Sequence, residues 1–150
     1  MTIQSATYNE TQFILNHAIN VFTESTVGHI EPSWDKALQS VSLFLNNGGY
    51  YFINTENNKI KGWIGIGVTY DSYTDKEIGF IQELYVLPEY RNAGIARELC
   101  KEATIHLKQQ GCQEIQLNVF VGNGAKNLYR KLGFQDLYTT MKLDFGSNTD

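Results

Sequence analysis

Residues 91–96, Arg-Asn-Ala-Gly-Ile-Ala, place a cation and a glycine between an apolar run and a helical pattern. The preceding Leu84–Leu87 has the composition of a strand that is covered on both faces. The first N–H groups of a helix are unpaired and attract anions, Arg91 adds positive charge, and Gly94 lets the backbone come close to a ligand. The segment is therefore predicted to bind a phosphate group. The alternative is an ordinary turn between a strand and a helix.

The stretch Val86–Ala96, V-L-P-E-Y-R-N-A-G-I-A, resembles the acetyl-CoA signature of the GNAT superfamily of N-acetyltransferases, where R/Q-x-x-G-x-G/A wraps the pyrophosphate. Downstream, Ala125–Phe134, A-K-N-L-Y-R-K-L-G-F, resembles the family's A-x-x-L-Y-x-K-x-G-F. The resemblance is specific over residues 81–134, and the rest of the chain matches by element order. It implies cofactor contacts by Arg91, Asn92, Ala93, Gly94, Ile95 and Ala96.

Acetyl transfer to an amine needs a held thioester, a donor for the developing oxyanion, a deprotonated amine and a proton for the leaving thiolate. By resemblance, the backbone of Leu84, Tyr85 and Val86 holds the pantetheine where two central parallel strands splay apart, and an N–H near Tyr85 meets the acetyl carbonyl. The resemblance also implies a hydrogen bond from Asn123 to pantetheine. The family's usual Asn, seven residues before the Tyr, is Gly122 here, so the loop departs from the pattern.

Glu83 is the candidate base, because a carboxylate inside I-Q-E-L-Y-V is expected to be buried, which raises its pKa toward a useful value. The alternatives are a Glu paired with a cation across the sheet or pointing out at an edge. Family members vary at this step, and several use water chains instead of one base.

Tyr129 is the candidate acid. In the family motif that it resembles, the Tyr hydroxyl points at the cofactor sulfur, and a phenol that is neutral at pH 7 can give the thiolate a proton or a hydrogen bond. The alternative is a core tyrosine that packs on the next strand.

The acceptor site is expected between the first two helices and the connection after the third strand. Acids and aromatic rings there would suit an ammonium group. The alternative is that acidic loops serve solubility alone. The candidates are Glu24, His29, Glu31, Tyr70, Asp71 and Tyr73.

Composition narrows the function. The net charge is −4, with ten acidic and four basic residues in 1–90 against six acidic and eight basic in 91–150. A nucleic-acid binder would show a basic stripe, so none is expected as a partner. The uneven charge favours an anionic ligand in the second half and a cationic one in the first; random fluctuation is the alternative.

Length and composition predict a single compact domain over residues 1–150, in which 42% of the residues are hydrophobic. The first residues lack the pattern of a signal peptide, and no apolar run approaches the roughly 20 residues of a membrane span. Cys100 and Cys112 indicate reduced thiols and a cytoplasmic location, and neither they nor the scattered histidines indicate a metal site. The oligomeric state is open, with a homodimer among the alternatives.

The periodicity predicts an α/β fold, a GNAT-like mixed sheet in the order β-α-α-β-β-β-α-β-α-β. Asn9 and Gln12 resemble a capping box that opens the first helix, and Pro32 suits the first turn of the second. Bare Gly65 and Gly67 in a strand mark the close approach of another element. The expected strands are Ile3–Thr7, Tyr50–Asn54, Ile60–Tyr70, Ile78–Leu87, Glu114–Val119 and Phe134–Phe145, with a loop at Thr23–Ile30, helices at Gly94–Gln110 and around Ala125–Leu132, and a frayed end at Gly146–Asp150.

The leading hypothesis is thus an acetyl-CoA-dependent N-acetyltransferase for a primary amine of a small molecule or a protein. A non-catalytic acyl-CoA-binding sensor of the same fold is the alternative. A nucleotide-binding α/β module is a third possibility, which the lack of a G-x-x-x-x-G-K-[ST] loop disfavours.

Overall fold

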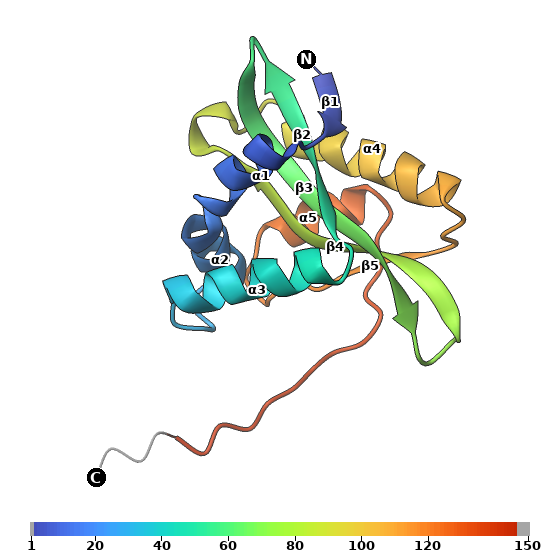
Figure 1. The fold of residues 1–150 in the computed structure, drawn as a ribbon. Coiled ribbons are helices and arrows are strands. Elements are labelled where there is room, and N and C mark those ends of the chain that lie inside the picture. The colour runs from blue at the N-terminus through green and yellow to red at the C-terminus, as the bar shows by residue number, and fades with distance from the viewer. Residues whose placement is uncertain (1, 147–150) are drawn as a thin grey trace.

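A five-stranded mixed sheet in the order β1-β2-β3-β4-β5 runs through the protein (Figure 1). The structure is a computed structural model, and it describes residues 2–146. The first four strands pair antiparallel in succession, and the fifth pairs parallel with the fourth. The strands are β1 Thr2–Ser5, β2 Tyr50–Glu56, β3 Lys59–Asp71, β4 Lys76–Val86 and β5 Ile115–Leu117.

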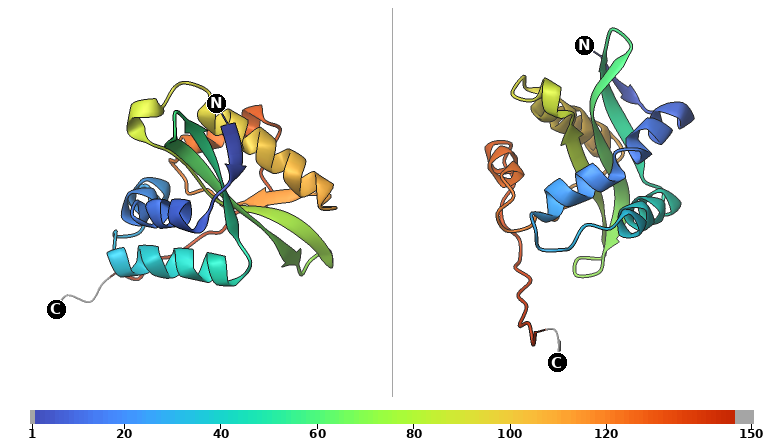
Figure 2. Two further views of the ribbon diagram at one scale, coloured as in Figure 1. Left: turned by 45° about the horizontal axis from the view of Figure 1, so that its top comes forward. Right: turned by 90° about the vertical axis from the view of Figure 1, so that its left-hand side faces the viewer.

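Helices cover both faces of the sheet (Figures 1 and 2). One face carries α1 Tyr8–Leu15, α2 Ala18–Thr26 and α3 Trp34–Asn46. The other face carries α4 Ile95–Gln109 and α5 Ala125–Lys131, and the short 3₁₀ helix η1 Pro88–Tyr90 joins β4 to the loop before α4.

The helix α4 packs on the sheet with the stripe that its sequence predicts. Ile95, Leu99, Ala103 and Leu107 are all buried, and they contact strand residues such as Ile66. The start of α4 lies near the end of β4, because α4 belongs to the crossover that connects β4 to its parallel neighbour β5. The predicted α/β class and the parallel central pair are confirmed.

The close approach predicted at the β3 glycines is also confirmed. A Cβ on Gly65 would lie 2.9 Å from the Tyr51 ring and 3.2 Å from Phe44, a residue of α3. At Gly67 the nearest atoms are more distant, at 3.6 Å and 4.0 Å. The bare surface of β3 therefore lets α3 lie close to the sheet.

The first helical region differs from the prediction. Thr7, not Asn9, caps α1: its hydroxyl accepts from the Glu10 N–H, and its own N–H donates to the Glu10 carboxylate at 2.8 Å. The helix breaks after Leu15 and resumes as α2, which continues to Thr26 through part of the expected loop.

The helix predicted to have Pro32 in its first turn is α3, and it starts later than predicted. Ser33 caps α3 with its side chain, so Pro32 lies before the helix and not in its first turn. Between α2 and α3 the chain forms a short connection that begins at Val27, which has a left-handed φ of 48°.

The strand expected over Phe134–Phe145 is wrong for the single chain. Within the described residues, 134–146 form neither helix nor strand and extend away from the body of the protein (Figure 1). The observed order is therefore β-α-α-α-β-β-β-α-β-α, with η1 between β4 and α4. Residues 147–150, part of the expected frayed end, lie outside the described residues.

Candidate active site

The regular alternation of side chains along strand β4 is interrupted at Gln82. Gly65 of β3 pairs with Glu83, but the next β3 residue, Ile66, pairs with Ile81, so Gln82 is an extra residue in the ladder. Such a β-bulge re-aims the side chains that follow it, and bulges are common beside active sites. Here Ile81 faces α4, whereas Glu83 and Tyr85 face the α1–α3 side.

The second half of β4 has a free edge. β5 pairs with β4 only over Gly79–Ile81, and within residues 2–146 no strand pairs with that side of β4 from Gln82 to Val86. The Leu87 N–H donates to Lys61 of β3 at 2.9 Å. Because main-chain groups alternate along a strand, those of Leu84 and Val86 lie on the opposite, free edge. The Tyr85 carbonyl lies toward Gly62 of β3, so the groups of Tyr85 itself are not on this edge.

The loop after η1 delivers the chain to the start of α4. Asn92 has a φ of 65° and Gly94 a φ of 80°, both left-handed, so the loop turns tightly. No side chain among the described residues caps α4, and Gly94 at its N-cap would carry a Cβ into open space. Asn92 and Ala93 are exposed, whereas Ile95 is buried and anchors the loop. The unpaired N–H groups of the first turn are therefore accessible to an anion.

The side chain of Arg91 is directed away from this loop. Its Nε donates to the Val86 carbonyl at 2.8 Å, and its Nη2 donates to Glu24 of α2 at 2.8 Å. The guanidinium also lies over the Tyr85 ring, with its central carbon 5.2 Å from the ring centre. The expected contribution of the Arg91 charge to a phosphate site thus has no support in its contacts. Its main chain still belongs to the loop.

Glu83 is held by two neutral donors. Its Oε1 accepts from the Tyr51 hydroxyl at 3.0 Å, and its Oε2 accepts from Trp63 Nε1 at 2.8 Å. Loss of hydration raises the pKa of Glu83, and these two hydrogen bonds oppose that rise. The direction agrees with the expectation for a base, and the ion-pair alternative finds no partner cation among the described residues.

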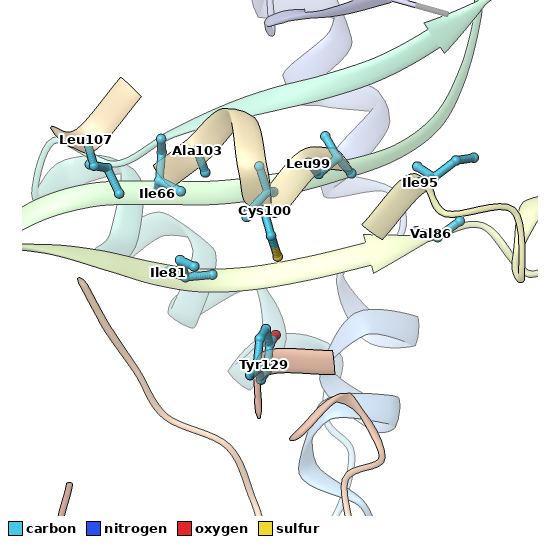
Figure 3. Close-up of a cluster of buried hydrophobic side chains, with 10 residues drawn as sticks. Ile66, Ile81, Val86, Ile95, Leu99, Cys100, Ala103, Leu107 and Tyr129 are labelled. Atoms are coloured by element: carbon cyan, nitrogen blue, oxygen red, sulfur yellow. The ribbon is translucent and has the colours of Figure 1, made fainter. Parts of the chain in front are cut away.

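Tyr129 is buried between α5 and the sheet, and Figure 3 shows its ring pointing from α5 toward β4. The ring of Phe134 packs edge-on against it at 5.7 Å. Burial raises the pKa of the Tyr129 hydroxyl above its usual value, and the nearby Cys100 thiol adds to the rise. The hydroxyl therefore keeps its proton at neutral pH, as a donor to a leaving group must.

Asn123 opens α5. Its Oδ1 accepts from the Ala125 N–H at 3.0 Å, and its Nδ2 donates to the Ser25 carbonyl of α2 at 3.4 Å. Both ends of the amide thus have protein partners, and a contact with pantetheine would use the remaining capacity of the side chain or the backbone.

A cleft of about 660 Å³ lies between α1, α2 and the end of β4. Phe13, His17 and Tyr85 form aromatic walls, and Glu24 and Glu89 supply carboxylates. His17 packs against Trp63 with ring centres 5.5 Å apart, and Trp63 in turn donates to Glu83. An acidic, aromatic cleft beside a free strand edge can take a cationic group.

The sequence model of the acetyltransferase (GNAT) family matches residues 15–134, most of the chain. The chain belongs to the acetyltransferase (GNAT) family.

Named relatives of this GNAT chain agree with that membership. It is 32% identical over 119 residues to the thialysine N-epsilon-acetyltransferase of Mus musculus, covering 79% of this chain and 59% of that protein. It is 33% identical over 72 residues to the aminoglycoside N(6')-acetyltransferase type 1 of Acinetobacter haemolyticus, covering 45% of this chain and 50% of that protein. The chain thus spans between half and three fifths of the length of these curated relatives.

Solved structures share the GNAT fold across nearly the whole length. A putative acetyl transferase from Pyrococcus furiosus superposes with a TM-score of 0.81 at 20% identity, covering 96% of this chain and 99% of that one. A predicted acetyltransferase with acetyl-CoA from Clostridium acetobutylicum gives a TM-score of 0.73 at 22% identity, covering 95% of each chain. These likenesses show the fold.

The GNAT chain does not bring its six acceptor candidates together. Glu24 lines the cleft, but the β3–β4 hairpin that carries Tyr70, Asp71 and Tyr73 precedes β4, and Tyr85 is at its far end. That stretch of strand spans about 30 Å at 3.3 Å per residue. The expected acceptor cluster is therefore wrong as a group.

The remaining two candidates lie on the connection between α2 and α3. The His29 ring bonds the Val121 carbonyl through Nε2 at 2.7 Å and stacks on Phe120 at 5.3 Å, while Glu31 is exposed. His29 thus fastens this connection to the loop before α5.

Several site residues were not found from the sequence. His17 lines the cleft, and Tyr51 and Trp63 hold Glu83, yet nothing in their local sequence marks them. Glu89, which also lines the cleft, lies inside the signature-like stretch but had no role assigned to it. Arg97 had a visible signal: it extends the motif to R-N-A-G-I-A-R and is an exposed cation in the first turn of α4.

No helix in residues 2–146 is both long and apolar enough to cross a membrane. Across the same residues, no set of three or more His, Cys, Asp or Glu side chains is arranged to hold a metal ion.

Proposed function

We propose that residues 1–150 form one catalytic domain that transfers an acetyl group from acetyl-CoA directly to a primary amine of a small molecule or a protein. The observation that carries the proposal is the continuity of two features: the free edge of β4 leads, through η1 and the tight loop, to the uncapped first turn of α4. A long ligand with an amide-rich arm and a pyrophosphate fits that track.

The loop would hold the pyrophosphate by its main chain. The N–H groups of Gly94, Ile95 and Ala96 converge at a helix start where a Cβ on Gly94 would meet nothing. Because the charge of Arg91 is paired with Glu24, the cation proposed for the phosphate is Arg97, which is exposed in the first turn of α4.

The arm of the cofactor would lie along β4 as an added strand, past the point where β5 stops pairing with β4. The main-chain groups of Leu84 and the N–H of Val86 offer hydrogen bonds on the free edge, whereas the Val86 carbonyl already accepts from Arg91. One of the two N–H groups would meet the acetyl carbonyl as charge grows on its oxygen. The backbone of Tyr85 serves the sheet, so this assignment moves the expected donor by one residue.

The cleft would bind the acceptor amine. Glu89 attracts a cation, Glu24 shares its charge between the cleft and Arg91, and Tyr85 of β4 lines the cleft. The names of the relatives include thialysine and aminoglycoside acetyltransferases, and both acceptor types carry amines that would be cationic at neutral pH. The acidic lining of the cleft favours a small polyamine over a neutral amine as the acceptor.

In the reaction, the amine nitrogen attacks the thioester carbon, a C–N bond forms and the C–S bond breaks. The amine proton would pass by way of water to Glu83, which does not itself line the cleft but whose raised pKa suits proton uptake. The Tyr129 hydroxyl would donate a hydrogen bond or its proton to the departing sulfur.

The test is thiol release from acetyl-CoA with four acceptor classes: polyamines, aminoglycosides, amino acids that include thialysine, and peptides. Saturable release with any class, and an acetylated product by mass spectrometry, would support the proposal. Tight binding of acetyl-CoA in calorimetry without release for any class would favour the non-catalytic acyl-CoA sensor instead.

A further inference from the structure

His17 lies where the helical path of the chain breaks between α1 and α2. In a continuous α-helix the Phe13 carbonyl would accept from the His17 N–H. Here that N–H bonds the Ile14 carbonyl at 3.0 Å instead, and the ring of His17 bonds the Phe13 carbonyl through Nδ1, also at 3.0 Å. The side chain thus takes the place of a main-chain donor at the end of α1.

The bond to Phe13 determines which ring nitrogen of His17 carries the hydrogen. A carbonyl oxygen has no hydrogen to give, so Nδ1 must be the donor. The neutral ring therefore has its lone pair on Nε2. Among residues 2–146 no group forms a hydrogen bond with Nε2. The ring thus keeps one nitrogen that can accept a hydrogen bond or a proton.

The ring of His17 forms part of the wall of the cleft between α1, α2 and the end of β4. Phe13, His17, Asn20 and Glu24 follow one another at helical spacing on the wall that α1 and α2 form, and Tyr85 of β4 lines the same cleft. Nδ1 is turned to the main chain of α1. Nε2 is therefore the nitrogen that a ligand in the cleft can reach.

Two aromatic side chains hold the imidazole of His17 in this orientation. The ring centre of Phe13 is 4.8 Å from that of His17, and the ring centre of Trp63, a fully buried residue, is 5.5 Å from it. Trp63 also packs on Tyr85, with ring centres 5.1 Å apart. His17 and the part of β4 that is proposed to hold the thioester therefore contact the same rigid neighbour.

The proposed reaction requires the acceptor nitrogen to lose two protons. A primary amine with a pKa of about 10 is protonated at neutral pH, and an ammonium group has no lone pair with which to attack the thioester. One proton must leave before the attack, and a second must leave the nitrogen once the C–N bond forms. Glu83, proposed to take a proton by way of water, does not line the cleft, whereas His17 does.

We propose that His17 is a catalytic residue whose Nε2 accepts a proton from the ammonium group of the acceptor before the attack. This inference rests on the proposed function. An N–H bond of the ammonium group breaks and an Nε2–H bond forms, which gives the free amine and an imidazolium. The free amine then attacks the thioester, and the second proton passes through water to Glu83. The imidazolium returns its proton to water when the product leaves.

The charges around the cleft suit this transfer. Glu24 and Glu89 line the cleft with His17 and attract the imidazolium once it has formed. Arg91 opposes it, but the charge of Arg91 is paired with Glu24 at 2.8 Å. Glu83 lies behind Trp63, whose Nε1 donates to it, so it has no direct contact with the imidazole.

The kinetic test uses two variants that each keep one of the two nitrogen positions. In His17→Asn the side-chain amide can still donate to the Phe13 carbonyl, but it has no atom at the place of Nε2. In His17→Gln the amide reaches the place of Nε2 and can form a hydrogen bond there. Neither amide takes up a proton. Thiol release from acetyl-CoA gives kcat/KM between about pH 7 and about pH 9.5, with the acceptor that the wild type uses fastest among the four classes.

Both variants are expected to lower kcat/KM about 10²-fold at pH 7. The deficit should shrink toward about pH 9.5, because more of the acceptor is already deprotonated as the pH approaches the pKa of a primary amine, about 10. His106→Asn, which changes a half-buried histidine of α4 outside the cleft, is the control and should keep the wild-type pH profile. Circular dichroism should show all three variants folded.

A histidine that only closes the end of α1 would behave differently. His17→Asn would then retain the wild-type kcat/KM, or would lose the same factor at every pH, and either result would overturn the proposal. Full kcat/KM in His17→Gln would overturn it too, because a hydrogen bond without proton uptake would then be sufficient. If the wild type releases no thiol with any acceptor class, acetyl transfer itself is rejected, and the role of His17 with it.

A measurement without turnover tests the state of the ring. In nitrogen NMR spectra of the histidine side chains, the signals that are absent from His17→Asn identify His17. The neutral ring is expected as the tautomer with hydrogen on Nδ1. A neutral ring with hydrogen on Nε2 would overturn the proposal even in an active enzyme, because that nitrogen could not then accept a proton.

Discussion

The Arg91 guanidinium donates to the Glu24 carboxylate at 2.8 Å and so joins the loop before α4 to the wall of the cleft. Both side chains are about two fifths to one half exposed, so the pair itself adds little stability. The pair matters for position, because Glu24, which is proposed to attract the amine, is held by Arg91 of the proposed cofactor loop.

Glu24→Gln is therefore expected to weaken acceptor binding and leave acetyl-CoA binding unchanged. The amide keeps a hydrogen-bond acceptor for Arg91 but loses the charge. For a partly exposed charge pair worth up to about 1 kcal/mol, KM for a cationic acceptor should rise about two- to fivefold. Glu31→Gln, an exposed acid outside the cleft, is the control and should keep the wild-type KM. If both variants raised KM equally, net charge and not the cleft would be responsible.

Gly94→Asp should weaken CoA binding at least tenfold, since it places a carboxylate where the pyrophosphate is proposed to lie and charge-assisted hydrogen bonds contribute about 1.5–3 kcal/mol each. Gly94 has a φ of 80°, so any side chain there adds strain. Gly94→Asn is the matched control, because Asn tolerates this conformation and carries no charge. Calorimetry should rank affinity as wild type, then Asn, then Asp. Equal affinities for Asn and Asp would place the phosphates elsewhere.

Glu83 should set the acidic limb of the pH profile. Because burial raises its pKa, the carboxylate is protonated and inactive as a base below that raised value, and kcat/KM should rise as pH increases through it. Glu83→Gln should lower kcat/KM by about 10²–10⁴ and flatten this limb. A variant that retains the wild-type limb would assign it to the pKa of the amine or to another group.

Tyr51→Phe offers a finer test of the same assignment. The Tyr51 hydroxyl donates to Glu83 and lowers its pKa, so removing the hydroxyl should raise that pKa further. The acidic limb should then move to higher pH with little change in the plateau, whereas a merely structural hydroxyl would lower the plateau and leave the limb in place.

Tyr129→Phe should lower kcat by about 10–10³ with nearly unchanged acetyl-CoA affinity, because a donor to the departing sulfur acts mainly in the transition state. The ring that fills the core is retained, so the melting temperature should hardly change. Tyr50→Phe is the control: that hydroxyl bonds His106 at 2.6 Å, on α4, and has no proposed role in transfer. Full kcat in a folded Tyr129→Phe protein would remove this residue from the mechanism.

Gly65 and Gly67 of β3 should respond differently to alanine. In Gly65→Ala the new Cβ would lie 2.9 Å from the Tyr51 ring, and overpacking of this kind costs about 1–3 kcal/mol. Gly67→Ala meets only ordinary contacts at 3.6 Å and 4.0 Å and should be close to neutral. Urea unfolding measures both free energies of unfolding. Equal values would mean that Tyr51 yields without cost.

Local patterns predicted the elements whose cause is local. The helical spacing of Ile95, Leu99 and Ala103 was sufficient to place α4, and the bare glycines of β3 predicted that another element comes close, which the structure shows to be α3. The break between α1 and α2 was not predictable in this way, because the apolar pattern continues across it and the turn depends on how both pieces pack on the sheet.

The site was predicted in part for the same reason. The motif indicated the loop and Tyr129, but the partners of a side chain are set by strands that are distant in sequence. Glu83 meets Tyr51 and Trp63 from β2 and β3, and Arg91 meets Glu24 from α2. The segment from Phe134 had a strand pattern, yet a strand also needs a neighbour, and sequence periodicity does not show that one is present.

The extra residue at Gln82 changes which residues of β4 face α4. Before it, odd-numbered side chains such as Ile81 face α4; after it, even-numbered ones such as Val86 do. Deleting Gln82 would leave Ile81 opposite Ile66 and Glu83 opposite Gly65 in an unbroken ladder, so every later side chain of the strand would keep its present face. A single-codon deletion at Leu84 would instead carry Tyr85 to the α4 face and Val86 to the cleft side, so it should be far less tolerated than a deletion of Gln82.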